Sequence, residues 1–295
     1  MSDIGKLLNR VDGLLDRVER LMPAEEPSVD WKASIAFRWR TKNGRGLLHP
    51  VSQVHRIQLK DLRGIDEQKR LVEQNTRQFV EGYPANNVLL TGARGTGKSS
   101  LIKALLIKYA PRGLRVIEVE KQDLLDLPEI VDCIYQRPER FVLYCDDLSF
   151  EADEPGYKAL KVVLDGSVAA ASENCVIYAT SNRRHLMPEY MHENLEYKHV
   201  GEEIHPGETS EEKVSLSERF GVWVSFYPFD QDEYLNIVAV WLEHFRIADV
   251  RSHEVREAAL QWALQRGSRS GRVAWQFARD WAGAQRMKAE TGRRK

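Results

Sequence analysis

Short runs of apolar residues alternate along this chain with longer stretches in which apolar residues recur at helical spacing. The short runs are typical of strands buried on both faces of a sheet, and they lie at residues 88–90, 114–119, 141–145, 175–180 and 222–226. The helically spaced stretches between them lie at residues 67–80, 98–109, 127–135 and 157–164. This alternation predicts an α/β fold with a mostly parallel sheet and right-handed crossovers.

Both ends of the chain are predicted to be helical. Residues 4–22 have a nearly heptad apolar pattern, which predicts one amphipathic helix that either folds onto its own domain or a neighbouring subunit, or acts as a partner-binding zipper. After Pro228, helical patterns follow at 230–245, 252–265 and 271–287. We therefore expect a helix and linker over 1–27, a nucleotide-binding α/β domain over 28–228, and a small helical lid domain over 229–295.

Residues 36–40 alternate aromatic and basic side chains, a pattern that allows two interpretations. The aromatic rings could stack on nucleic acid, or the segment could be an edge strand whose aromatic side chains enter the core. The strand is the favoured interpretation. Residues 191–213 are rich in glutamate and histidine, but their spacing fits no metal-ligand pattern, so a solvated acidic loop is predicted there.

Composition and charge narrow the class of protein. The 43 basic residues are balanced by 44 acidic ones, so the chain lacks the overall positive charge of a dedicated nucleic-acid coat protein. Cys133, Cys145 and Cys175 have no C-x-x-C spacing and are interpreted as small core residues of a reducing compartment. No apolar run approaches a membrane span and charges interrupt the N-terminal pattern, which predicts a cytoplasmic protein without membrane insertion.

The segment after the first predicted strand fits G-x-x-x-x-G-K-[ST], flanked by a strand and a helix as that motif requires. Glycines let the backbone bend around a phosphate chain and direct N–H groups at its oxygens. Lys98 can then reach the β- and γ-phosphates, and the Ser99 hydroxyl can ligate Mg²⁺. The predicted phosphate-binding residues are Gly92, Ala93, Arg94, Gly95, Thr96, Gly97, Lys98, Ser99 and Ser100.

Polar residues follow two other predicted strands, where ligands bind in open α/β sheets. Asp146 is expected to hold Mg²⁺ through water, and Asp147 to polarise the attacking water. Asn182 follows the strand at 175–180. Gly64 and Ile65 precede the helix at 67–80 and are a candidate cover for the nucleotide base.

The order of these motifs resembles that of AAA+ ATPases. Within them, the chain resembles most a bacterial group filed as a domain of unknown function, and its motif style is similar to the replication-initiator and helicase-loader branch. The segments that carry the resemblance are Ala36-Phe37-Arg38-Trp39, the phosphate loop, Cys145-Asp146-Asp147-Leu148-Ser149-Phe150, residues 179–186, Ile204-His205-Pro206-Gly207-Glu208 and Ser217-Glu218-Arg219-Phe220-Gly221. The resemblance implies a three-layer fold with a five-stranded parallel sheet and a helical lid.

The resemblance also implies roles for individual residues. These are Lys98 and Ser99 as the Walker A pair, Asp146 and Asp147 as the Walker B pair, Asn182 as sensor 1, Arg219 as the arginine finger that acts on a neighbouring subunit, and Arg272 as sensor 2, with Arg269 as the alternative. Most AAA+ enzymes have glutamate at the position of Asp147. The shorter side chain puts fast hydrolysis in doubt.

Three functions are compatible with these motifs. The first is an oligomeric ATPase that uses ATP and Mg²⁺ and remodels or loads a protein or nucleic-acid partner. The second is an ATP-controlled assembly switch with slow turnover. The third, a small-molecule kinase, explains neither Arg219 before a fifth strand nor the helical C-terminal domain.

Overall fold

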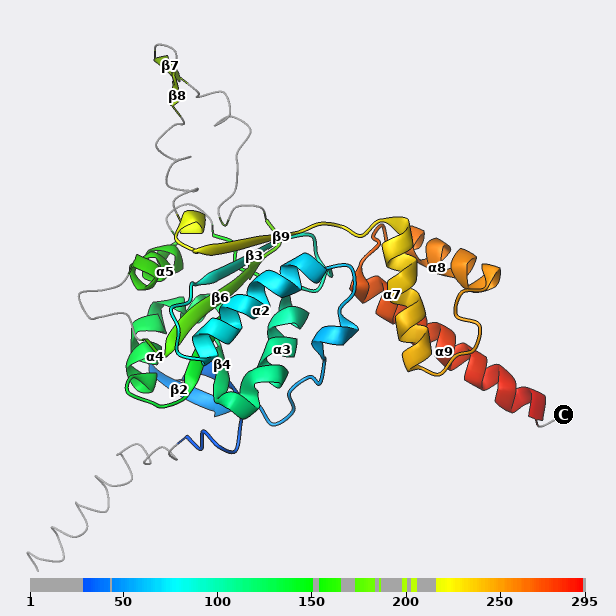
Figure 1. Ribbon diagram of the computed structural model, residues 1–295, viewed down its shortest axis with the longest axis horizontal. Coiled ribbons are helices and arrows are strands. Elements are labelled where there is room, and N and C mark those ends of the chain that lie inside the picture. Colours follow the sequence, from blue (N-terminus) through cyan, green and yellow to red (C-terminus); the bar gives the residue numbers. More distant parts are fainter. Residues whose placement is uncertain are drawn as a thin grey trace, which may run out of the picture. The chain divides into compact units, whose positions relative to one another are not determined.

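The computed structural model describes residues 29–42, 44–150, 154–165, 173–183, 186, 198–200, 203–205 and 216–293 (Figure 1). The chain divides into two compact units, Met1–Ala33 and Ser34–Lys295, and the fold below is that of the second. The helix and linker predicted over 1–27 lie outside the described residues. Among the helices that the structure does describe, none is both long enough and apolar enough to cross a membrane.

A seven-stranded sheet forms the centre of the second unit, in the order β2-β1-β4-β5-β6-β3-β9. Its strands are β1 (Ala36–Lys42), β2 (Arg45–Pro50), β3 (Val88–Gly92), β4 (Leu114–Glu118), β5 (Arg140–Cys145), β6 (Cys175–Ser181) and β9 (Val222–Phe226). All neighbours are parallel except β1 and β2, which form an antiparallel pair. The five predicted parallel strands are confirmed, and β1 and β2 extend the sheet beyond them.

Strand β1 lies inside the sheet, between β2 and β4, and its aromatic side chains are buried. Phe37 is fully buried and Trp39 is 1% exposed, and the Trp39 indole N–H donates to Asp126 at 2.9 Å. Arg38 forms an ion pair with Glu118 of β4. The strand predicted at 36–40 is confirmed, although it does not lie at the edge of the sheet. The alternative interpretation, in which these rings stack on nucleic acid, is wrong because the rings are packed in the interior.

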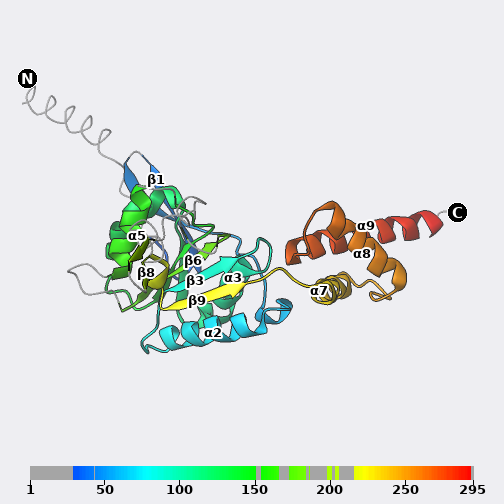
Figure 2. The same ribbon diagram turned by 90° about the horizontal axis from the view of Figure 1, so that it is seen from above.

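Helices cover both faces of the sheet, which gives the three-layer arrangement predicted for the AAA+ fold (Figures 1 and 2). On one face, α2 (Asp66–Val80) and α3 (Lys98–Tyr109) share a core cluster with residues of β3, β5 and β6. The crossover rule places α4 (Leu127–Ile134) and α5 (Pro155–Asp165) on the other face. Short 3₁₀ helices lie at η1 (Leu59–Asp61), η2 (Ala110–Arg112) and η3 (Lys121–Asp126).

Three C-terminal helices pack on one another (Figure 2): α7 (Gln231–His244), α8 (His253–Gln265) and α9 (Gly271–Arg293). Helix α7 begins with a capping box in which Asp230 and Glu233 satisfy each other's backbone N–H groups. Ser252 is the N-cap of helix α8, and its hydroxyl accepts from the Val255 N–H. These helices confirm the predicted ones, with caps where the sequence has capping residues.

Two expectations need correction. Residues 191–213 are not wholly a loop, because β7 (Lys198–Val200) and β8 (Glu203–His205) form a short antiparallel hairpin within them. Cys133 is exposed rather than a core residue, whereas Cys145 is buried and Cys175 is partly buried. In the described part of the chain, no cluster of His, Cys, Asp and Glu side chains has the composition of a metal site.

Candidate nucleotide site

The phosphate loop connects β3 to α3 and is held against β9. Gly92 has φ +118°, and a Cβ atom there would lie 1.9 Å from the carbonyl oxygen of Phe226. The next residue, Ala93, donates its backbone N–H to that same oxygen at 3.1 Å. Gly97 adopts φ +106° immediately before α3. These glycines therefore allow a close approach to β9 and a left-handed turn into the helix, both of which a side chain would obstruct.

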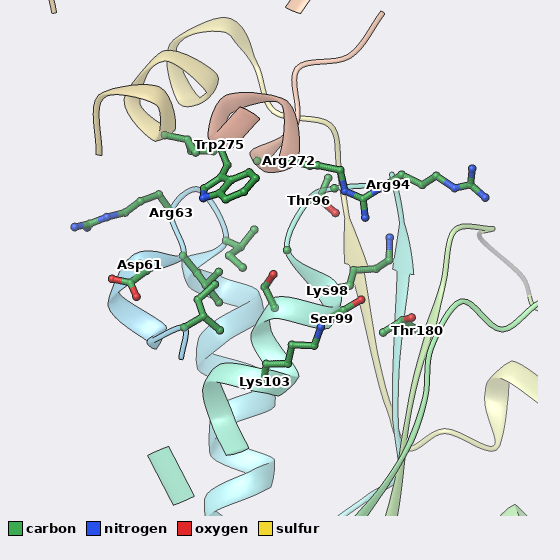
Figure 3. Close-up of a pocket in the computed structure, with 18 of the residues that line it drawn as sticks. Asp61, Arg63, Arg94, Thr96, Lys98, Ser99, Lys103, Thr180, Arg272 and Trp275 are labelled. Carbon is green, nitrogen blue, oxygen red and sulfur yellow. The ribbon is translucent and has the colours of Figure 1, made fainter. Parts of the chain in front are cut away.

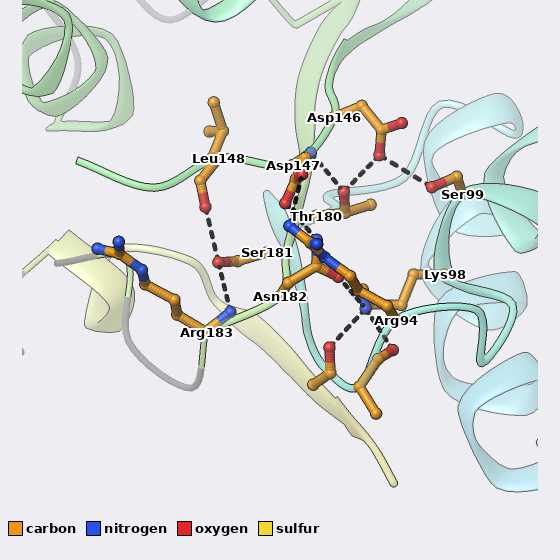
Figure 4. A network of polar contacts seen from close by, with 12 residues as sticks. Arg94, Lys98, Ser99, Asp146, Asp147, Leu148, Thr180, Ser181, Asn182 and Arg183 are labelled. Carbon is orange, nitrogen blue, oxygen red and sulfur yellow. Dashed lines mark hydrogen bonds and ion pairs between the residues drawn. The ribbon is translucent and has the colours of Figure 1, made fainter. Parts of the chain in front are cut away.

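Lys98, the first residue of α3, is 6% exposed, and its ammonium group is bonded to carbonyl oxygens of the loop (Figure 4). Its Nζ atom donates to the carbonyl oxygens of Gly92 at 2.6 Å and Ala93 at 2.8 Å, and to Oδ1 of Asn182 at 3.1 Å. Burial lowers the pKa of Lys98, and the charges of Asp147 and Asp146 oppose that shift. The ammonium group is thus positioned at the loop, at the positive N-terminal end of a helix.

Asp146 connects the ends of three elements. Its Oδ1 atom accepts hydrogen bonds from Ser99 at 2.8 Å and from Thr180 at 2.6 Å. Burial raises the pKa of Asp146, but hydrogen bonds from Thr180 and the other nearby hydroxyl groups outweigh it, and the pKa is lowered overall. The carboxylate is therefore held in its charged form beside the Ser99 hydroxyl.

Asp147 is fixed by neighbours on both sides. Its backbone has φ +53°, and its N–H donates to Thr180 Oγ1 at 2.9 Å. The side-chain amide of Asn182 donates to Oδ1, and Arg94 pairs with Oδ2 at 3.8 Å (Figure 4). Asn182 thus contacts both Lys98 and Asp147, and it joins the phosphate loop to the aspartate pair.

A pocket of about 660 Å³ opens above these groups (Figure 3). The predicted residues that line it are Ile65, Arg94, Gly95, Thr96, Gly97, Lys98, Ser99, Ser100, Asp146, Asp147, Asn182 and Arg272. Gly92 and Ala93 contribute the carbonyl groups beneath Lys98. Gly64 lies beside the pocket against Phe229, where an added Cβ would be 3.0 Å from the ring. The structure therefore gathers most of the predicted residues around one cavity.

The helical C-terminal region contributes directly to the pocket. The Gly271 N–H donates to the carbonyl oxygen of Gly95 at 2.8 Å, which joins the start of α9 to the phosphate loop. Arg272 and Trp275 follow on α9 and line the pocket. Arg269 instead lines a second hollow of about 770 Å³ beside Leu264. Of the two candidate sensor-2 arginines, Arg272 is the one that shares the pocket with Lys98.

Arg219 is not among the residues of this pocket. It follows a single helical turn at 216–218, and its Nε atom lies 2.5 Å from Oδ1 of Asp165 at the end of α5. The structure thus separates the predicted arginine finger from the nucleotide site of its own chain.

The sequence analysis missed several residues at the site. Thr180 binds both the Asp146 side chain and the Asp147 backbone. Trp241 and Trp275 give the far wall of the pocket an aromatic character. A signal existed for Trp275, which lies three residues after Arg272 and therefore on the same face of a helix. No sequence pattern indicated that Trp241 would reach the pocket, because its position depends on how α7 packs against α9.

The donor set fits a nucleoside triphosphate with Mg²⁺. The Ser99 hydroxyl and Asp146 carboxylate are hard oxygen ligands of the kind that Mg²⁺ prefers. Lys98, Arg94 and Arg272 supply positive charge around the phosphate loop. The pocket volume is in the range of small-molecule and cofactor sites, which is roughly 300–1,000 Å³.

Solved structures similar to this chain include three proteins with low sequence identity. The Holliday junction branch migration motor RuvB of Thermotoga maritima is 16% identical with a TM-score of 0.46, and the match covers 75% of this chain and 63% of RuvB, less than two thirds of its length. The replication initiator DnaA bound to AMPPCP and single-stranded DNA is 18% identical with a TM-score of 0.47, over 75% of this chain and 65% of DnaA. A chain of the HORMA:CdnC:Trip13 complex of E. coli MS115-1 is 12% identical with a TM-score of 0.45, over 75% of this chain and 90% of that one.

No curated protein sequence matches the chain. Residues 32–285, in contrast, match a protein family described as "Protein of unknown function (DUF815)". That match includes the sheet, the phosphate loop, the aspartate pair and most of the C-terminal helices. The chain therefore belongs to the DUF815 family of proteins of unknown function.

Proposed function

We propose that this protein binds ATP with Mg²⁺ and hydrolyses it as an oligomer, and that hydrolysis is coupled to remodelling or loading of a partner. The observation that carries the proposal is the convergence of Lys98, Asp146 and Asn182 at the carboxyl ends of three neighbouring strands, in a pocket that Arg272 completes from α9. Ligands bind at that edge of open α/β sheets.

Each group at the site has a chemical role in this proposal. Lys98 and the backbone N–H groups of the loop bind the phosphates, and Arg272 adds charge from the helical region. Mg²⁺, ligated by Ser99 and through water by Asp146, would neutralise charge on the phosphate oxygens. Asp147 polarises the attacking water, and Asn182 orients both that water and the Asp147 carboxylate.

Movement of the proposed lid, residues 229–295, would couple hydrolysis to work on a partner. The link from Gly271 to Gly95 and the position of Arg272 join α9 to the phosphate loop, so a change in the phosphates would alter the contacts of α9. Arg219 acts on the neighbouring subunit's nucleotide in this proposal, because it does not line its own pocket.

An ATP-controlled assembly switch with slow turnover is the second candidate. Both Asp147 carboxylate oxygens have partners, since Oδ1 accepts from Asn182 and Oδ2 pairs with Arg94. The Asp147 carboxylate is one methylene shorter than that of a glutamate and already accepts a hydrogen bond from Asn182, so it is less free to polarise water. This arrangement favours slow hydrolysis, so that the protein stays in its ATP-bound state for long periods.

The decisive experiment measures ATP binding, hydrolysis and particle size with and without ATP. We expect Lys98→Ala to lose ATP binding, because its ammonium group is the one positioned by the loop. Lys108→Ala is the matched control, since Lys108 is on the same helix but pairs with Glu73 away from the pocket. Equal affinity of the Lys98→Ala and wild-type proteins would refute the proposed site. The assembly switch would be favoured if the protein assembles when ATP is added but hydrolyses that ATP more slowly than it assembles.

A further inference from the structure

Helix α9 (red in Figure 1) carries a row of exposed arginines. Arg272, Arg279 and Arg286 lie seven residues apart, and all three are exposed. Because seven residues are almost two complete helical turns, the three side chains lie along one stripe that is about 21 Å long. Within the part of the chain that the structure describes, no carboxylate forms an ion pair with any of the three.

The segment around these arginines concentrates positive charge. Between positions 266 and 288, six basic residues stand against one acidic residue, Asp280, although the whole chain has a formal net charge of −1. The six are Arg266, Arg269, Arg272, Arg279, Arg286 and Lys288. Where acidic side chains of α7 and α8 form described ion pairs, their partners lie on α8: Asp232 pairs with Arg256, and Glu257 with His253. This end of the fold therefore presents a local excess of positive charge.

Two of the arginines are held in place by contacts that use few of their hydrogen-bond donors. The guanidinium carbon of Arg279 lies 5.2 Å from the centre of the Trp275 ring, and Nη2 of Arg286 donates to the carbonyl oxygen of Phe245 at 3.0 Å. A guanidinium group has five N–H donors, so most of them stay available to a ligand. Its planar fork matches the oxygens of a phosphate group.

A glycine lies between these two arginines on the same face of α9. Gly283 follows Arg279 by four residues and precedes Arg286 by three, which is the spacing of neighbours on a helix surface. Glycine destabilises the interior of a helix relative to alanine. An added Cβ atom at Gly283 would meet no atom within 4 Å, so packing among the described residues does not account for the glycine. It does leave the helix backbone open to close approach by a ligand.

We propose that this face of α9, the arginine stripe formed by Arg272, Arg279, Gly283 and Arg286, binds the phosphate backbone of a nucleic acid. Each strand of DNA carries a phosphate about every 3.4 Å along the duplex axis, so a straight row of cations meets negative charge over its whole length. An acidic peptide would have to place its carboxylates at the matching interval. As the partner in the proposed function, the nucleic acid rests on that proposal, whereas binding to the stripe requires no ATP.

The test measures binding of a labelled oligonucleotide of mixed sequence, as a single strand and as a duplex, without ATP and over a range of salt concentrations. Arg272 is left intact because it lines the nucleotide pocket. In the double variant Arg279→Gln/Arg286→Gln, affinity at low salt should fall roughly tenfold or more. The slope of log affinity against log salt concentration should become shallower by about two, because two phosphate contacts are lost.

The matched control is Arg70→Gln/Arg77→Gln. These two arginines are also exposed and seven residues apart, but they lie on α2, whose sequence includes Asp66, Glu67 and Glu73. The control removes the same charge at the same spacing, so its affinity and salt dependence should stay close to those of the wild type.

A third variant, Gly283→Leu, separates a loss of binding from a loss of folding. Leucine favours a helix more than glycine does, so the unfolding midpoint should equal or exceed that of the wild type, whereas the side chain between the arginines should weaken oligonucleotide binding.

The inference is overturned if the wild type binds neither oligonucleotide at low salt, if the α9 double variant loses no more affinity than the α2 control, or if Gly283→Leu binds as tightly as the wild type. Competition by polyglutamate as strong as that by unlabelled oligonucleotide would also overturn it, and would point to an acidic protein instead. Lys98→Ala, expected to lose ATP binding, should still bind the oligonucleotide. Failure of the wild type to bind ATP would therefore overturn the proposed function and leave the nucleic-acid surface standing.

Discussion

Arg219 forms an ion pair with Asp165, and 2.5 Å separate Nε of Arg219 from Oδ1 of the carboxylate. The Asp165 side chain is 44% exposed, whereas that of Arg219 is 23% exposed, so solvent reaches the pair mainly from the carboxylate side. In the proposed assembly, the guanidinium would exchange this carboxylate for the phosphates of a neighbouring subunit. Its planar fork and permanent charge suit both partners.

If Arg219 acts on the neighbouring subunit, Arg219→Ala should nearly abolish hydrolysis and leave ATP binding largely intact. Arginine fingers supplied from outside a site typically contribute about 10³ to 10⁵ in rate. Mixing this variant with inactive Lys98→Ala should restore part of the activity, because some interfaces would join an intact loop to an intact arginine. A mixture that stays inactive although subunits exchange would contradict the role, as would a monomer that hydrolyses ATP at full rate.

We expect Asp147→Asn to bind ATP as the wild type does and to hydrolyse it far more slowly. The substitution removes the charge that polarises water, whereas Asp146 and its bonds to Ser99 and Thr180 remain. Equilibrium binding and single-turnover hydrolysis measure the two effects separately. A loss of affinity as severe as in Lys98→Ala would show that Asp147 is needed for ATP binding and not only for polarising water.

Arg272→Ala should weaken ATP binding roughly tenfold or more, the scale of a lost hydrogen bond to a charged group. Arg269→Ala is the matched control, because it removes the same charge three residues earlier from a side chain that lines the second hollow. Its affinity should stay close to that of the wild type. Calorimetric titration with ATP measures the affinity of each variant. If Arg269→Ala weakens binding more than Arg272→Ala does, Arg269 is the lid arginine.

Gly92→Ala should destabilise the fold even without nucleotide. Its φ of +118° is strained for alanine, and the added Cβ would lie 1.9 Å from the Phe226 carbonyl oxygen. Together the strain and overpacking should cost roughly 2 to 5 kcal/mol of unfolding free energy. In Gly113→Ala, φ is +94° but no atom lies within 4 Å of the new Cβ, so only about 1 to 2 kcal/mol should be lost. Denaturant unfolding measures both losses. If the two variants lose the same unfolding free energy, the backbone around Gly92 moves away from β9 and removes the clash.

Much of the architecture was determined by local patterns in the sequence. The apolar runs predicted the parallel strands β3, β4, β5, β6 and β9, and helical spacing predicted α7 and α8, because such signals act over a few neighbouring residues. The loop glycines were predictable for the same reason, since backbone conformation depends on the residue itself. The roles assigned to Lys98, Ser99, Asp146 and Asp147 stay predictions that the site geometry supports.

Tertiary structure alone decided which side chains meet. Thr180 reaches Asp146 because β6 lies beside β5, and Arg219 meets Asp165 although 54 residues separate them. The same applies to Tyr178 of β6, whose hydroxyl meets Asn75 and Thr76 of α2. Such contacts depend on strand order and on the packing of helices distant in sequence, and no local pattern of residues encodes either.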